Sequence, residues 1–178
     1  LDGCRFLSIN DQEKLNFKLA TLLPKRHYAR KNLGYLLAKD HDVIIETDDD
    51  NFPYDTFWHE RKREQSAEVF NESGWVNVYG FFSKENIWPR GYPLHHLKNV
   101  VEHNSTVQNI ICPIQQGLAD ENPDVDAVYR MTMKLPIKFD QHNSLALGKN
   151  SWSPFNSQNT TWFKEAFPLL YLPSYCSF

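Results

Sequence analysis

Hydrophobic positions in this chain fall into short runs and helical repeats that are separated by polar segments. Leu33, Leu36 and Leu37 recur at helical spacing within residues 30–38, which predicts an amphipathic helix. Val43-Ile44-Ile45 is an apolar run typical of a strand buried on both faces. The pattern predicts these further elements: strands at 5–9, 75–80 and 109–114, a helix at 11–22 capped by Asn10 or Asp11, an irregular segment at 53–72, and a core segment at 167–173.

Three consecutive aspartates, Asp48, Asp49 and Asp50, follow the apolar strand. Open α/β sheets bind ligands at the carboxyl ends of their strands, and carboxylate oxygens suit Mg²⁺ or Mn²⁺. We therefore expect Asp48 and Asp50 to bind a divalent metal, with Asp49 beside a bound diphosphate. An Asp-Asp-Asp-Asn-Phe-Pro segment is equally typical of a turn, so the pattern by itself leaves both interpretations open.

Basic side chains occupy two places where an anion is a candidate ligand. Arg30 and Lys31 open the predicted helix, where acidic residues are preferred, so a bound diphosphate would explain their position. Arg90 lies in a rigid loop with two prolines, and its planar guanidinium suits a phosphate or a sugar carboxylate. The alternatives are a solvated basic helix face at Arg30 and a structural arginine at Arg90.

Asp124 and Asp126 are two residues apart and would face the same side of an extended backbone. One carboxylate would then bind sugar hydroxyls, while the other acts as general base in an inverting transfer. The segment Pro-Asp-Val-Asp is also a good helix start, which predicts an N-cap before Ala127. The two interpretations are compatible if each aspartate has its own role.

Neutral hydrogen-bonding side chains gather at residues 156–160, directly before Trp162 and Phe163. Sugars stack their faces on aromatic rings and pair their hydroxyls with amides, so this segment is a candidate sugar site. A loop that caps the following helix would have a similar composition.

Several of these segments together resemble the STELLO-like family of glycosyltransferase-related proteins, which have a GT-A type nucleotide-diphospho-sugar transferase fold. The resemblance spans nearly the whole chain in one order. The matching stretches are Phe6–Leu15, Tyr28–Leu36, Trp88–Leu94, Gln115–Leu118, Pro123–Tyr129 and Pro154–Thr160.

The resemblance implies an α/β fold with a GT-A-like, Rossmann-type mixed sheet flanked by helices. It also implies a nucleotide-sugar donor, Mn²⁺ or Mg²⁺, a glycan or protein acceptor, and association with a polysaccharide synthase complex on the luminal side of the Golgi. The residues we then expect at the site are as follows: Arg30, Lys31, Asn32, Asp48, Asp49 and Arg90 for the donor, Asp48 and Asp50 for the metal, Gln116, Gly117, Asn156 and Asn159 for the acceptor, and Asp124 and Asp126 for catalysis.

The extent of the chain predicts a single domain over residues 1–178. Compared with the complete fold of the family, it starts almost directly at the strand expected at 5–9 and stops before an Asp-x-x-Arg-type segment. We therefore expect a fragment that lacks the first strand and the C-terminal segment, with any membrane anchor outside it. A net charge of −3 and the lack of a basic block give no indication of nucleic-acid binding.

Two other functions agree with parts of the sequence. A non-catalytic scaffold of a glycan-synthesis complex would keep the transferase fold without turnover. A Mg²⁺-dependent phosphohydrolase would use an aspartate nucleophile, but such enzymes usually have Asp-x-Asp-x-Thr/Val after the strand. Here Asn51 and Phe52 follow Asp50, which favours the glycosyltransferase-like protein.

Overall fold

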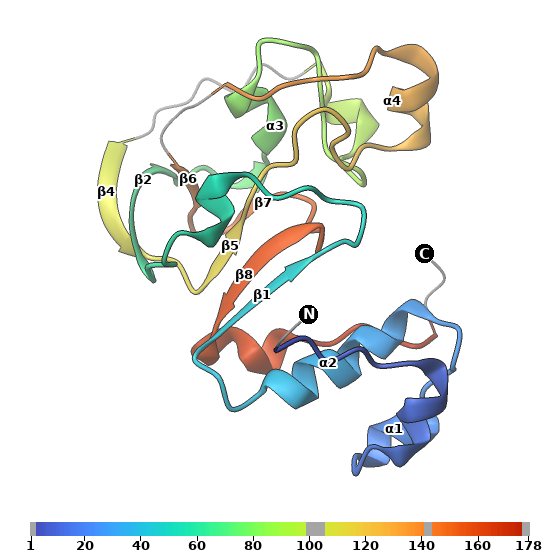
Figure 1. Cartoon of the computed structure of the whole chain (residues 1–178). Helices are drawn as coiled ribbons and strands as arrows, with labels where there is room; N and C mark the ends of the chain where they lie inside the picture. The colour runs from blue at the N-terminus through green and yellow to red at the C-terminus, as the bar shows by residue number, and fades with distance from the viewer. Residues whose placement is uncertain (1–2, 99–105, 141–143, 176–178) are drawn as a thin grey trace. The chain divides into compact units, whose positions relative to one another are not determined.

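The computed structural model describes residues 3–98, 106–140 and 144–175 of the chain. Helices and short sheets alternate along it, which confirms the α/β class (Figure 1). Contacts divide the chain into two compact units. Unit 1 comprises Leu1–Ile44 and Trp162–Phe178, and unit 2 comprises Ile45–Thr161. None of the helices in these described ranges is both long enough and apolar enough to cross a membrane.

Unit 1 is built on short helices around a small apolar core. The helices are η1 (Ile9–Lys14, a 3₁₀ helix), α1 (Lys18–Leu22), η2 (Tyr28–Arg30, 3₁₀), α2 (Lys31–Ala38) and η5 (Lys164–Leu169, 3₁₀). Ala20, Leu23, Ala29 and Leu33 form the buried cluster between them. The helix expected at 30–38 is confirmed, because the periodic leucine Leu33 packs into this core.

The first two elements differ from the expectation. Residues 5–8 form no strand, and the predicted helix at 11–22 is divided into η1 and α1. Ser8 caps η1 through a capping box with Asp11, so the chain turns where a strand was expected. The hydrogen bond from the Ser8 hydroxyl is the largest effect that lowers the pKa of Asp11 to about 2.

The strands form three small sheets within the described ranges. Their orders are β1-β8-β5, β4-β2-β6 and β3-β7. The bounds are β1 Val43–Thr47, β2 Glu64–Phe70, β3 Gly74–Trp75, β4 Thr106–Ile111, β5 Ile114–Gln116, β6 Ser144–Leu147, β7 Ser151–Trp152 and β8 Asn159–Phe163. β2 pairs antiparallel with β4 and parallel with β6, so this sheet is mixed, whereas β3 and β7 pair parallel.

Some strand predictions need correction. β1 is buried on one face only, since Ile44 and Glu46 are buried while Ile45 is exposed. The segment expected to be irregular contains β2, and the strand expected at 75–80 is limited to β3 and followed by helix α3 (Val78–Phe82). Asn77 caps α3 by accepting a hydrogen bond from the Gly80 amide, which ends the extended backbone there. The segment at 167–173, expected in the core, exposes Leu169 and Tyr171.

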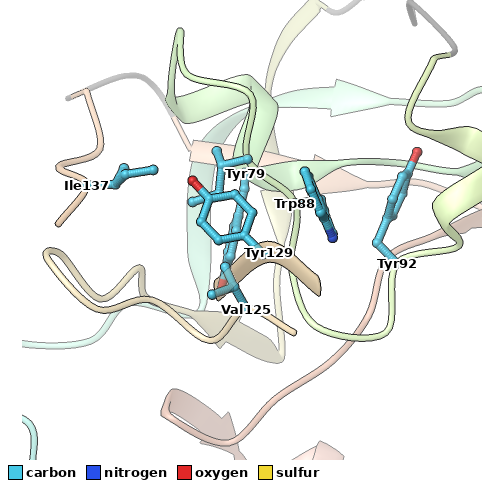
Figure 2. Close-up of a cluster of buried hydrophobic side chains, with 7 residues drawn as sticks. Tyr79, Trp88, Tyr92, Val125, Tyr129 and Ile137 are labelled. Atoms are coloured by element: carbon cyan, nitrogen blue, oxygen red, sulfur yellow. The ribbon is translucent and has the colours of Figure 1, made fainter. Parts of the chain in front are cut away.

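The main core of unit 2 is aromatic (Figure 2). The rings of Trp88 and Tyr129 meet edge to face with centroids 4.9 Å apart. Tyr129 belongs to α4 (Ala127–Thr132), the helix predicted after Asp126. The buried members of the cluster are Tyr79, Ile87, Trp88, Tyr92, Val125, Tyr129 and Ile137.

Candidate functional site

The ends of three strands meet at one edge within unit 2. The amide of Asp48, just after β1, donates to the carbonyl of Gln158, just before β8, at 3.2 Å. The amide of Gly117, just after β5, donates to the carbonyl of Asn159 at 2.8 Å. The side chain of Asn51 also donates to the Gln158 carbonyl, at 2.7 Å. The acidic turn and the predicted amide segment therefore lie side by side.

The loop before β8 is organised by Asn156. Its carbonyl accepts hydrogen bonds from the Gln116 side chain at 2.6 Å and from the Thr160 hydroxyl at 3.0 Å. Its side-chain oxygen accepts from the Gln158 amide at 3.2 Å. Asn156 therefore connects the end of β5 to the start of β8, two segments that are far apart in the sequence.

Gly117 and Asn159 are in close contact at the same edge. A Cβ atom built on Gly117 would overlap the side-chain amide of Asn159. The missing side chain lets the asparagine amide lie directly over the backbone of the neighbouring strand. The structure thus brings together all four residues expected at the acceptor: Gln116, Gly117, Asn156 and Asn159.

Arg90 and Asp124 form an ion pair that is connected to the same loop through Tyr79. The Arg90 Nε atom donates to Asp124 Oδ1 at 2.6 Å, with the two side chains 62% and 20% exposed. The Tyr79 hydroxyl lies 3.4 Å from the Asp124 carbonyl, to which it donates. Burial and the negative charge of Asp124 raise the pKa of Tyr79, and a hydrogen bond with Asn156 lowers it. The net result is a pKa of about 12. Tyr79 therefore remains a neutral donor at physiological pH.

Asp126 has a structural role in the fold. Its Oδ1 atom accepts from the Tyr129 amide at 2.8 Å, which makes it the N-cap of α4. Its Oδ2 atom accepts from the Trp88 indole N–H, also at 2.8 Å. Both carboxylate oxygens are thus engaged inside the aromatic core, which confirms the N-cap interpretation and separates Asp126 from Asp124.

The three aspartates after β1 differ in exposure. Asp48 is half-buried, whereas Asp49 and Asp50 are exposed. Over the part of the chain that the structure describes, no three histidine, cysteine, aspartate or glutamate side chains come close enough to hold a metal ion. A cation at this turn would consequently need further oxygen ligands from a bound molecule.

The residues expected to offset the diphosphate charge belong to unit 1. The Arg30 guanidinium donates to the side chain of Gln12 at 2.9 Å and to the carbonyls of Leu7 and Ser8 at 3.2 and 3.1 Å. Its role within unit 1 is therefore to connect the N-terminal segment to η2.

The two neighbours of Arg30 also have partners in unit 1. The Lys31 ammonium lies 3.2 Å from the Tyr28 hydroxyl and 5.1 Å from the centre of its ring. The Asn32 side chain exchanges two hydrogen bonds with the backbone of Leu172, at 2.8 and 2.9 Å.

The aromatic residues expected to stack a sugar are not accessible. Trp162 and Phe163 are buried, because β8 is the central strand of its sheet. Phe52, Tyr54 and Trp58, which directly follow the acidic turn, are exposed instead. No functional role was predicted for these three residues, although aromatic residues at 52, 54, 57 and 58 lie close in sequence to four aspartates, which is a local signal of a candidate site.

Comparison with known proteins identifies two similar proteins of Arabidopsis thaliana. The chain is 32% identical to the protein named "Probable glycosyltransferase STELLO2" and 32% identical to "Probable glycosyltransferase STELLO1", in each case over 97% of this chain. The alignments cover 26% and 25% of the two relatives, so the chain spans about a quarter of their length. No protein-family model matches the chain.

Proposed function

Because the chain belongs to the STELLO-like family of glycosyltransferase-related proteins, we propose that unit 2 binds a nucleotide-diphospho-sugar and takes part in transfer of the sugar to an acceptor. The observation that supports this most is the strand edge where the acidic turn at 48–50 meets the amide loop at 156–159. Carboxylates for a cation and amides for hydroxyl groups are the two kinds of ligand that such a donor needs.

We infer that a divalent cation binds at the acidic turn. Mg²⁺ and Mn²⁺ take oxygen ligands, and Mg²⁺ is usually bound by one or two carboxylates together with substrate phosphates and water. Asp48 and Asp50 would supply the carboxylates, and the absence of a third ligating side chain among the described residues is consistent with a diphosphate completing the set. When bound, the cation would offset the charge of the departing diphosphate.

The side chains of unit 2 suggest a division of roles. Arg90 is an exposed cation suited to contact with a phosphate or a sugar, and the carboxylate of Asp124 orients its guanidinium. Asp124 is also the candidate general base for the acceptor hydroxyl, because its carboxylate is partly exposed and is held in place by its ion pair with Arg90. Asp126 holds the start of α4 and the Trp88 ring, so we give it a positioning role.

Titration of donors into the complete natural protein tests this proposal. We expect UDP- or GDP-sugars to bind only with Mn²⁺ or Mg²⁺, and the Asp48→Asn, Asp50→Asn double variant to lose that binding. Asp55→Asn is the matched control, because Asp55 is an exposed aspartate in the next helical turn, and it should bind the donor as the natural protein does. Metal-independent binding, or binding that survives the double substitution, would contradict the metal assignment.

A scaffold without catalysis is the second candidate, on the basis of the same family. It predicts a folded protein that binds no donor with either metal, while still assembling with a polysaccharide synthase complex. We expect either form of the protein to act on the luminal side of the Golgi, as the family resemblance implies, and fractionation of the tagged protein would test that expectation.

A further inference from the structure

The segment that follows the acidic turn exposes three aromatic side chains within seven residues. Phe52 is 94% exposed, Tyr54 60% and Trp58 73%. Aromatic residues usually bury most of their area, so three exposed rings this close in the sequence make the segment a candidate interaction site. We call residues 51–61 the aromatic loop.

The aromatic loop is anchored along its whole length, within unit 2. At its start, Asn51 donates to the Gln158 carbonyl and to the Thr47 hydroxyl, at 2.7 and 2.9 Å. In its middle, the Tyr54 hydroxyl donates to Asp120 Oδ2 at 3.2 Å. The exposed rings are thus carried by a backbone that is fixed to neighbouring segments.

The end of the aromatic loop is fixed in the same way. Arg61 donates to the carbonyl of Phe57 at 2.8 Å, and its guanidinium lies 5.5 Å from the centre of that ring. The Phe57 and Trp58 rings meet edge to face at 5.1 Å. Because Phe57 supports the indole from one side, Trp58 can bind a ligand with little loss of side-chain freedom.

The composition around these rings favours a sugar over a protein partner. Four aspartates lie at positions 48, 49, 50 and 55, whereas the centres of protein interfaces are depleted in aspartate. A saccharide presents C–H faces that pack on aromatic rings and hydroxyls that donate to carboxylates. The negative charge of Asp49 and Asp55, which are not assigned to the metal, also disfavours an acidic saccharide.

We propose that the aromatic loop binds a neutral oligosaccharide and presents it as the acceptor to the acidic turn. The assignment as acceptor rests on the proposed function, since a donor must bind next to it for transfer. Its chain continuity with Asp48–Asp50, through the Asn51 contacts with Thr47 and Gln158, would place the glycan beside the donor. The acceptor would accordingly be a glycan and not an unglycosylated protein.

The test measures binding of hexasaccharides of glucose, mannose and xylose, and of hexagalacturonate, to the complete natural protein. We expect at least one neutral hexasaccharide to bind more tightly than hexagalacturonate. Phe52→Ala and Trp58→Ala should each weaken its affinity by about two- to tenfold, which is the range for loss of one aromatic contact. Trp152→Ala is the matched control, because Trp152 is 63% exposed but lies on β7 outside the loop, and it should leave the affinity unchanged.

Three results would overturn the inference: no neutral hexasaccharide binds, the loop variants bind as well as the natural protein, or Trp152→Ala weakens binding equally. Loss of a protein partner in the loop variants, with no glycan bound, would identify a protein-docking surface instead. Donor titration separates this from the proposed function, because the Phe52→Ala and Trp58→Ala variants should lose affinity for the glycan and still bind the donor with its metal. A natural protein that binds the glycan but no donor would contradict the proposed function and leave the aromatic loop a glycan-binding surface without an acceptor role.

Discussion

The substitution Asp126→Ala tests whether the role of Asp126 is structural or catalytic. The substitution removes the N-cap of α4, which costs about 0.5–2 kcal/mol, and leaves the Trp88 indole N–H without its acceptor. Trp88 is only 4% exposed, so the unpaired donor costs a further 1–3 kcal/mol or so. We expect Asp126→Ala to lower the free energy of unfolding by about 1.5–5 kcal/mol.

Asp126→Asn divides that loss between the two hydrogen bonds. The asparagine oxygen can still accept from the Tyr129 amide at the N-cap, but its amide group cannot accept from Trp88. The expected cost is therefore only the part that belongs to the indole, about 1–3 kcal/mol. Asp124→Ala is the control, because it removes a partly exposed ion pair and should cost about 0–1 kcal/mol.

Urea unfolding of the complete protein, followed by tryptophan fluorescence, gives these free energies, and hydrogen exchange at 127–132 locates the change in α4. A double-mutant cycle with Trp88→Phe should show a coupling energy of at least about 0.5 kcal/mol between Trp88 and Asp126. A structural role for Asp126 is contradicted if Asp126→Ala leaves the free energy of unfolding and the hydrogen-exchange protection of α4 unchanged. If that variant is stable but has lost transfer activity, Asp126 belongs with the catalytic residues after all.

Two further predictions concern Tyr79 and Arg30. Burial raises the pKa of Tyr79 to about 12, so between pH 10 and 12 the tyrosine is deprotonated in the unfolded chain but still protonated in the folded one. The free energy of unfolding should therefore fall by roughly 2–3 kcal/mol as the pH rises through that window. Tyr79→Phe should show a smaller fall when its unfolding is measured over the same range. Arg30→Lys loses the forked donation to Gln12 and two carbonyls, which should destabilise unit 1 by about 1–3 kcal/mol and leave donor affinity unchanged in a titration. A drop in affinity without loss of stability would return Arg30 to the donor site.

The elements predicted correctly from the sequence are those whose signals lie within a few neighbouring residues. The helix at 30–38 and the N-cap at Asp126 depend on spacing and on one side chain, and both are confirmed. Strand β2 was missed because its buried residues, Ala67, Val69 and Phe70, are accompanied by the polar residues Glu64, Ser66 and Glu68, so that the segment has a polar composition. Its pairing with β4 and β6 comes from residues about forty and eighty positions away.

Site geometry depends even more on distant residues. The sequence placed Gln116 and Asn156 in separate segments, and their hydrogen bond exists only because β5 and β8 lie in one sheet. Burial of Trp162 likewise follows from the central position of β8, which no local pattern reveals. The local sequence pattern therefore does not show that Trp162 and Phe163 are buried.

The aspartates of unit 2 show how the fold narrows the candidates for chemistry. Asp126 caps a helix and binds an indole, and Asp120 accepts from the Phe139 amide and from Tyr54. These carboxylates could not leave their partners without a cost in stability. The exposed oxygens at Asp49 and Asp50 carry no such cost, since a cation would replace only water there. A bound cation therefore costs the least stability at the acidic turn. The aromatic loop that continues from this turn is the adjoining surface with groups suited to a neutral glycan.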